Sequence, residues 1–218
     1  MRKKRNLINI FIIILTILLS MITVGCEKKQ EIKKVNNYGK ITLKKFTDEE
    51  EILLNSVCDK HFGFQLHQRE VDNRCVKFWV DYYENGKKKE TIPIGMIVME
   101  NFKKNPNVIM LSINKYNTVE KRVELWNISL TRGKEDKKIF KMINKPNEEM
   151  SFYKWQGVSE VDIISRKPIT LVSYIENGIE NISEVPLLVD LNQNEKKYMG
   201  QVLKNKYVYL LRCQFIDQ

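Results

Sequence analysis

The chain has 218 residues, of which 43% are hydrophobic and 29% charged, an ordinary composition for a folded protein that excludes wholesale disorder. Its formal net charge is +10 at pH 7, from 37 Lys and Arg against 27 Asp and Glu. The lysines are spread along the whole chain and no nucleic-acid-binding motif accompanies them, so we expect no nucleic-acid partner.

The first element in chain order is an N-terminal leader. Met1–Asn6 is cationic and Leu7–Gly25 is an apolar run of 19 residues, which is the layout of a secretory signal peptide. The run ends in Thr-Val-Gly-Cys at positions 23–26, which resembles the lipobox of bacterial lipoproteins. The resemblance implies cleavage before Cys26 and a diacyl lipid, with palmitate among its chains, on the Cys26 thiol. An uncleaved membrane helix is the alternative, because about 20 apolar residues span a bilayer.

Both alternatives place the rest of the chain outside the cytoplasm, because the cationic end of a leader stays inside. A diacyl anchor has two chains, which suffice for stable attachment. We therefore expect residues 1–25 to be the signal peptide, residues 26–38 a polar tether and residues 39–218 an exported domain. The domain would be held at the extracytoplasmic face of the cell membrane through the lipid on Cys26.

The exported domain begins with a strand and a helix. Ile41–Phe46 alternates weakly between apolar and polar residues, which predicts a strand. A helix over Asp48–Asp59 follows, because Thr47 can cap its first turn and Glu50 can complete a capping box. Three apolar residues fall on one face of this helix: Ile52, Leu53 and Val57.

The remaining pattern is that of an antiparallel β protein. Val76–Tyr83 alternates with period two, and Asn85-Gly86 supplies the positive φ angles of a tight hairpin turn. Further strands are expected at Ile94–Met99, Val108–Asn114, Arg122–Thr131, Ile169–Ile175 and Tyr207–Phe215. The predicted fold class is α+β, mainly antiparallel β, in the form of a β-sandwich with one short N-terminal helix.

Two segments share the pattern V-x-Y-x-E-N-G, namely Val80–Gly86 and Val172–Gly178. The match predicts a second hairpin at Asn177-Gly178 and a duplicated β half, unless it is accidental. The halves would be residues 39–131 and 151–218, and Arg132–Met150 between them is charged and contains a proline, as expected of a linker or a long loop.

Cysteine and histidine residues form the most specific chemical pattern. Cys58, His61, His67 and Cys75 fall within 18 positions, and sulfur with imidazole is the ligand set that zinc prefers. The spacing matches no zinc module, so a Cys58–Cys75 disulfide and two buried thiols remain alternatives. Cys213 alternates with the apolar residues of its strand and is interpreted as a core thiol.

Two pairs of residues could line a surface site. Trp79 and Tyr83 share the polar face of their predicted strand, where aromatic rings form either a platform for a sugar or a protein, or the floor beneath a helix. Glu160 and Asp162 would share a strand face, either as a hydrolytic carboxylate pair or as ordinary solvated acids.

No local catalytic signature accompanies these residues, and we assign no catalytic residue. The predicted function is a non-catalytic binding or interaction module at the cell envelope, contacting another envelope protein, a wall polymer or a small ligand. The alternative is an exported hydrolase that uses zinc through the Cys/His group, and zinc is the one cofactor that the sequence suggests.

Overall fold

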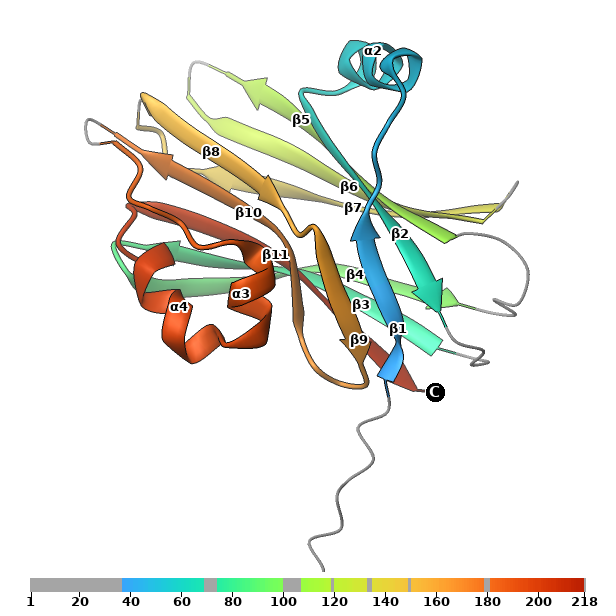
Figure 1. Ribbon diagram of the computed structural model, residues 1–218. Coiled ribbons are helices and arrows are strands. Elements are labelled where there is room, and N and C mark those ends of the chain that lie inside the picture. The colour runs from blue at the N-terminus through green and yellow to red at the C-terminus, as the bar shows by residue number, and fades with distance from the viewer. Residues whose placement is uncertain are drawn as a thin grey trace, which may run out of the picture. The chain divides into compact units, whose positions relative to one another are not determined.

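The computed structural model describes residues 37–68, 74–99, 107–118, 120–132, 135–148, 150–178 and 181–217. Within these residues, eleven strands form two antiparallel sheets (Figure 1). The first sheet has the order β7-β6-β5-β2-β1-β9 and the second the order β4-β3-β11-β10-β8. The predicted fold class, α+β and mainly antiparallel β, is confirmed, and the described residues contain two short helices besides the one predicted. The predicted signal peptide, Cys26 and most of the tether lie outside the described residues.

The strands of the first sheet are β1 (Asn37–Leu43), β2 (Lys60–Gln68), β5 (Asn107–Asn117), β6 (Arg122–Arg132), β7 (Glu135–Lys145) and β9 (Glu160–Ile164). Those of the second are β3 (Arg74–Glu84), β4 (Lys87–Met99), β8 (Phe152–Gly157), β10 (Ile169–Asn177) and β11 (Tyr207–Asp217). The helices are α2 (Asp48–Val57), α3 (Leu188–Gln193) and α4 (Glu195–Val202). No described helix has both the length and the apolar composition needed to cross a bilayer.

The core lies between the two sheets because alternate side chains of each strand point inward. On β11 the inward residues are Tyr207, Tyr209, Leu211, Cys213 and Phe215, each at most 1% exposed. They belong to one hydrophobic cluster with Ile109, Leu111 and Ile113 of β5. Cys213 is therefore the core thiol that its strand pattern predicts, and burial raises the pKa of this thiol.

Helices α3 and α4 cover the outer face of the second sheet, in front of β10 and β11 in Figure 1. Because both faces of β10 are covered, all nine of its residues are buried, including the polar Thr170, Ser173, Glu176 and Asn177. Asn192 on α3 fixes the helix to the sheet, accepting a hydrogen bond from the Thr170 backbone N–H at 2.7 Å and donating one to the Thr170 carbonyl at 2.9 Å.

Of the two predicted hairpins, only the first forms. Asn85 and Gly86 have φ angles of 48° and 76° and connect β3 to β4. After β10 the chain continues toward α3 instead of turning back, so the hairpin predicted at Asn177-Gly178 is wrong. The Asn177 side chain instead connects the end of β10 to the segment before β11, because its amide oxygen accepts a hydrogen bond from the Lys206 backbone N–H at 2.8 Å.

The segment predicted as a linker, Arg132–Met150, is also different in the structure, because most of it forms strand β7. β7 lies at the edge of its sheet and carries four lysines among its eleven residues, which hides the inward alternation of Ile139 and Ile143. Lysine-rich edge strands are common because charge discourages pairing with other chains.

Candidate interaction surface

Helix α2 is stabilised by its own sequence. The Thr47 hydroxyl accepts a hydrogen bond from the Glu50 backbone N–H at 3.2 Å, and the Glu50 carboxylate accepts one from the Thr47 backbone N–H at 2.9 Å. The predicted capping box is therefore confirmed. Four acidic residues in the first turn, positions 48–51, further stabilise the positive end of the helix dipole.

Polar contacts hold α2 against the first sheet. Lys44 Nζ lies 2.9 and 2.8 Å from the two carboxylate oxygens of Glu50. His61 on β2 has its Nε2 atom 3.0 Å from Glu51 Oε2, and the His61 side chain is only 8% exposed. The helix is thus positioned by one ion pair and by hydrogen bonds rather than by burial of an apolar face.

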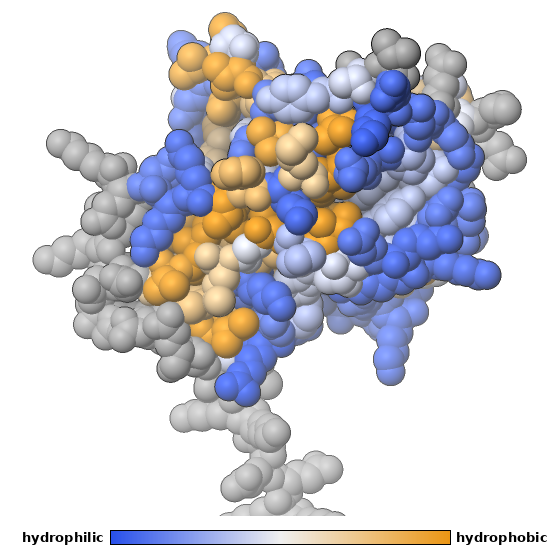
Figure 2. Space-filling view, turned by 180° about the vertical axis from the view of Figure 1, so that it is seen from behind, coloured by the Kyte–Doolittle hydropathy of each residue, from blue (hydrophilic) through white to orange (hydrophobic). Residues whose placement is uncertain are grey.

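The apolar side chains of α2 face solvent. No residue of the helix is buried, and Ile52, Leu53 and Val57 are 72%, 65% and 62% exposed. Full burial of a large aliphatic side chain stabilises a protein by about 1.5–3 kcal/mol, and this fold leaves all three contributions unused. Apolar side chains on the helix are visible at the upper left of Figure 2.

A second group of exposed apolar side chains lies on the outer face of the first sheet. Phe140 and Met142 on β7 are 67% and 59% exposed, and they pair across the strands with Asn127 and Leu125 of β6. Seen from behind, apolar side chains form a band bordered by polar ones (Figure 2). Bands of this kind mark interaction sites more often than isolated apolar residues do.

Two hollows flank α2. A hollow of about 420 Å³ separates the helix from the outer face of β5, β6 and β7, and its lining residues are Leu54, Val57, Cys58, Met110, Ser112, Asn127, Ser129, Asp136 and Lys138. A hollow of about 370 Å³ lies between the helix and β2, lined by Leu43, Lys44, Phe46, Glu51, Asn55, Lys60, His61, Phe62 and Gly63. The helix therefore overhangs the sheet and leaves space on either side.

The four predicted zinc ligands do not converge. Cys58 and His61 lie beneath α2, whereas His67 is exposed farther along β2, with its Nε2 atom 2.8 Å from Thr42 Oγ1. Cys75 is buried on β3, which belongs to the other sheet. Among the described residues no group of three or more His, Cys, Asp or Glu could hold a metal ion. The zinc hypothesis therefore fails because β2 and β3 separate into different sheets, and Cys58 and Cys75 are thiols rather than a disulfide.

Trp79 and Tyr83 do not form an exposed platform. Tyr83 is 8% exposed and belongs to the core cluster, and burial raises the pKa of its hydroxyl. Trp79 is half-buried. Next to them Arg212 joins Asp81, with Nε to Oδ2 at 3.1 Å, and Glu195 of α4, with Nη2 to Oε1 at 2.7 Å. This face of β3 is the floor beneath a helix, but the helix is α4 rather than α2.

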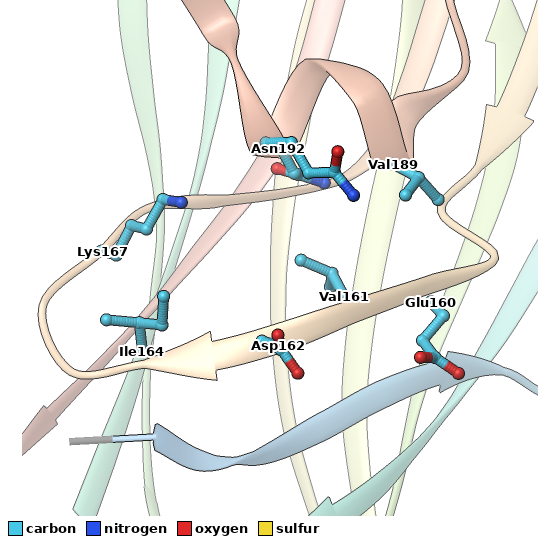
Figure 3. Close-up of a pocket in the computed structure, with 8 residues that line it drawn as sticks. Glu160, Val161, Asp162, Ile164, Lys167, Val189 and Asn192 are labelled. Atoms are coloured by element: carbon cyan, nitrogen blue, oxygen red, sulfur yellow. The ribbon is translucent and has the colours of Figure 1, made fainter. Parts of the chain in front are cut away.

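Glu160 and Asp162 lie on β9 beside a hollow of about 180 Å³ next to α3 (Figure 3). Both side chains are exposed, and both carboxylates point toward β1. Glu160 forms an ion pair with Lys40 of β1 at 2.6 Å, and this hydrogen bond raises the pKa of Lys40. The pair has the character of solvated surface acids.

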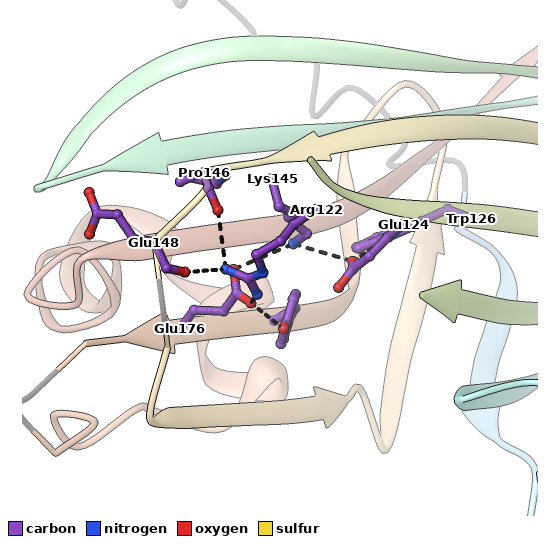
Figure 4. Close-up of polar contacts among 8 residues, drawn as sticks. Arg122, Glu124, Trp126, Lys145, Pro146, Glu148 and Glu176 are labelled. Carbon is purple, nitrogen blue, oxygen red and sulfur yellow. Dashed lines mark hydrogen bonds and ion pairs between the residues drawn. The ribbon is translucent and has the colours of Figure 1, made fainter. Parts of the chain in front are cut away.

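A buried ionic cluster lies at one end of the space between the sheets (Figure 4). The Lys145 side chain is 1% exposed, and its Nζ atom is 3.3 Å from Glu124 Oε2 and 3.8 Å from Glu176 Oε2. The same Nζ atom lies 3.1 Å from the ring centroid of Tyr209 and 4.1 Å from that of Tyr174. Burial lowers the pKa of Lys145 to about 8, although the two carboxylates act in the opposite direction.

Arg122 closes this cluster toward solvent. Its Nη2 atom donates to Glu176 Oε1 at 2.8 Å, and its Nη1 atom donates to the carbonyl oxygens of Pro146 at 3.2 Å and Glu148 at 2.9 Å. Burial alone would raise the pKa of Glu176, but Lys145 and the other donors outweigh it and hold that pKa below its usual value. The cluster thus ties the segment after β7 to β10 and is a structural element of the domain.

In a comparison with known families, the model of the YgaN domain matches residues 40–215. The chain belongs to the YgaN domain family. Comparison with curated proteins and with solved structures gives no match. The YgaN domain extends from β1 to β11, so it includes α2, the hollows beside it and the buried cluster, and the predicted leader precedes it.

Sequence reasoning identified α2 of this YgaN domain but missed the buried cluster. One signal was present, because Glu124 falls in the same alternating register as Trp126, Ile128 and Leu130, which are all buried on β6. A carboxylate on the apolar face of a strand indicates a buried partner. That partner, Lys145, lies in the segment predicted as a linker.

Proposed function

We propose that this chain is an extracytoplasmic lipoprotein, anchored to the cell membrane through Cys26, and that its YgaN domain is a non-catalytic module that binds another envelope protein through α2. The leader and the lipobox-like Thr-Val-Gly-Cys at positions 23–26 support the address. The geometry of α2 supports the binding role.

The binding role rests on one contrast: polar contacts hold α2 in place, whereas the side chains that it exposes to solvent are apolar. An isolated helix of ten residues is marginal in water, yet a capping box, the Lys44–Glu50 ion pair and the His61–Glu51 hydrogen bond fix this one in place. The exposed surface of the helix is apolar, because Ile52, Leu53 and Val57 are each more than half exposed. A preorganised apolar surface lowers the entropic cost of binding a partner.

A protein is a better partner for α2 than a lipid surface. The first turn of the helix carries four acidic residues, which anionic headgroups repel. This charge favours a protein rather than an anionic lipid surface as the partner.

Cysteine accessibility in intact cells tests both parts of the proposal. We would place a cysteine at an exposed helix position in the Leu53→Cys variant, and at an exposed position on α4 in the matched Lys196→Cys variant, and label both with a membrane-impermeant maleimide. The three native cysteines of the domain are buried. We expect Lys196→Cys to label in cells as fast as after purification, because the domain is outside, and Leu53→Cys to label severalfold more slowly in cells, because a partner covers it.

Two results would contradict the proposal. Absence of labelling at both positions in intact cells, with labelling after lysis, would place the domain inside. Equal rates for Leu53→Cys in cells and after purification would mean that nothing covers α2.

A further inference from the structure

We infer that the partner of α2 presents an uncharged, apolar protein surface, and that its contact with this domain extends from the second half of α2 over the outer face of β5, β6 and β7. This inference rests on the proposed function and adds the chemistry of the partner and the extent of the contact. It is carried by a group of uncharged side chains that continues from the helix onto the sheet.

Three rows of outward side chains on β5, β6 and β7 contain no charged residue. Trp126 of β6 is buried in the core, so its neighbours Leu125 and Asn127 point to the outer face. The cross-strand pairs of these strands define the rows: Ser112, Asn127 and Phe140; Asn114, Leu125 and Met142; Tyr116, Val123 and Asn144. None of these nine residues is charged and none is buried, although 29% of the residues in the chain are charged.

Large apolar side chains are exposed at the corners and along one edge of this uncharged surface. Tyr116 is 51% exposed, and Met142 and Phe140, two positions apart on β7, are 59% and 67% exposed. Val123 and Leu125 lie between them on β6 and are half-buried. A contiguous group of this kind indicates an interaction site, whereas a single exposed apolar residue does not.

The second half of α2 adjoins the same surface. Residues 52–57 of the helix carry no charge, and Leu53 and Val57 are four positions apart, which places them on one face. The Val57 carbonyl accepts a hydrogen bond from the Asn114 side-chain amide at 3.0 Å, and Asn114 is the cross-strand neighbour of Leu125. The uncharged surface therefore passes from the helix to the sheet through the Asn114 contact, beside the hollow rather than across it.

The absence of charge selects the chemistry of the partner. A charged group of the partner placed on this surface would lose its water and would find no opposite charge, which is costly. Apolar groups placed there gain free energy because water leaves both surfaces. The cores of protein interfaces are depleted of charged residues in the same way. The contact is therefore expected to depend little on ion pairs.

A different protein is a better occupant than a second copy of this chain. The formal net charge is +10, and it stays positive without the four basic residues at positions 2–5 of the predicted leader. Two such chains repel each other as they approach, whereas a partner of lower or opposite net charge does not meet this barrier.

Cysteine accessibility maps the extent of the contact. Met142→Cys lies on the uncharged surface, and Met96→Cys on β4 is the matched control, since the two methionines are 59% and 54% exposed. Both are labelled with a membrane-impermeant maleimide in intact cells and in the purified anchored chain in phosphatidylcholine nanodiscs. We expect Met142→Cys to label severalfold more slowly in cells than in nanodiscs, and Met96→Cys to label equally fast in both.

Salt and an added charge test the chemistry of the partner. Protection of Met142→Cys should persist in cells labelled in about 1 M salt, where the Debye length is about 3 Å. Asn144→Lys places one charge on the uncharged surface, and it should raise the labelling rate of Leu53→Cys in cells to the purified value. Gln201→Lys adds the same charge at an exposed position of α4 and should leave the protection of Leu53→Cys unchanged.

Four results would overturn the inference. Protection of Leu53→Cys without protection of Met142→Cys would confine the contact to the helix, and loss of protection in high salt would mean a charged partner. Slow labelling of Met142→Cys relative to Met96→Cys in nanodiscs that hold one chain would identify lipid as the occupant. Sedimentation showing a dimer that Met142→Ser dissociates would identify a second copy.

Failure of the proposed function gives a different result. If nothing covers α2, Leu53→Cys labels equally fast in cells and after purification. If only the chemistry or the extent of the contact is wrong, the protection of Leu53→Cys in cells remains.

Discussion

Replacing Lys145 by methionine removes the one positive charge that lies between two buried carboxylates. Lys145 Nζ is 3.3 Å from Glu124 and 3.8 Å from Glu176. Glu176 keeps Arg122 at 2.8 Å in the variant, but the remaining contact that the structure shows for Glu124 is a hydrogen bond from Trp126 Nε1 at 2.9 Å. The Glu124 carboxylate, with a side chain 4% exposed, is then an uncompensated buried charge.

The expected loss of stability follows from that geometry. Removing one partner of a buried ion pair costs about 3–5 kcal/mol, because the other charge stays desolvated. We therefore expect Lys145→Met to lower the free energy of unfolding by about 3 kcal/mol or more. Adding Glu124→Gln should restore about 2 kcal/mol, because it removes the stranded charge and keeps an acceptor for the Trp126 indole N–H.

Urea denaturation of the full chain, followed by tryptophan fluorescence, measures both effects. Lys138→Met is the matched control, since Lys138 lies on the same strand with its side chain 71% exposed and pairs with Asp136 at 3.0 Å. Its effect should stay within about 0.5 kcal/mol. The reasoning is refuted if Lys145→Met unfolds like the control, or if the double variant is less stable than Lys145→Met alone.

The structure makes two further predictions, and the sequence of the leader makes a third. The pKa of Lys145 is lowered from 10.5 to about 8 by folding, so at this residue the unfolded state binds more protons between these pH values, and the free energy of unfolding of the natural chain relative to Lys145→Met should increase from pH 8 toward pH 10 in urea denaturation. Thr47→Ala removes the cap of α2 and should reduce the protection of that helix against hydrogen exchange, at a cost of about 1 kcal/mol, without altering the β core. Cys26→Ser should move the chain from the membrane to the soluble fraction or leave it with an uncleaved leader, which mass spectrometry distinguishes.

Local features of the sequence predicted the fold well where neighbouring residues determine the structure. Thr47 and Glu50 are three positions apart, and the capping box that they form needs no tertiary contact. Asn85 and Gly86 likewise determine their turn through their own φ preferences. At Asn177 the same dipeptide signal failed, because contacts to Lys206 and to Asn205, far along the chain, fix the backbone there.

The candidate surface could be predicted only in part. The apolar stripe of α2 is evident from the spacing of Ile52, Leu53 and Val57, but whether it faces the core or solvent depends on where the chain carries the helix. Strand β7 also lines the hollow, and the lysines of this strand led to its prediction as a linker or a long loop. The zinc hypothesis failed for a similar reason. Its four residues are close in the sequence, but β2 and β3 belong to different sheets and keep Cys75 apart from the other three.

The central claim is that α2 contacts another protein at the cell envelope, and photo-crosslinking from position 53 of the anchored chain in living cells tests it most directly. With benzoylphenylalanine in place of Leu53, we predict one discrete adduct, and none from the same group at Lys196. No adduct from position 53, or the same adducts from both positions, would contradict the claim.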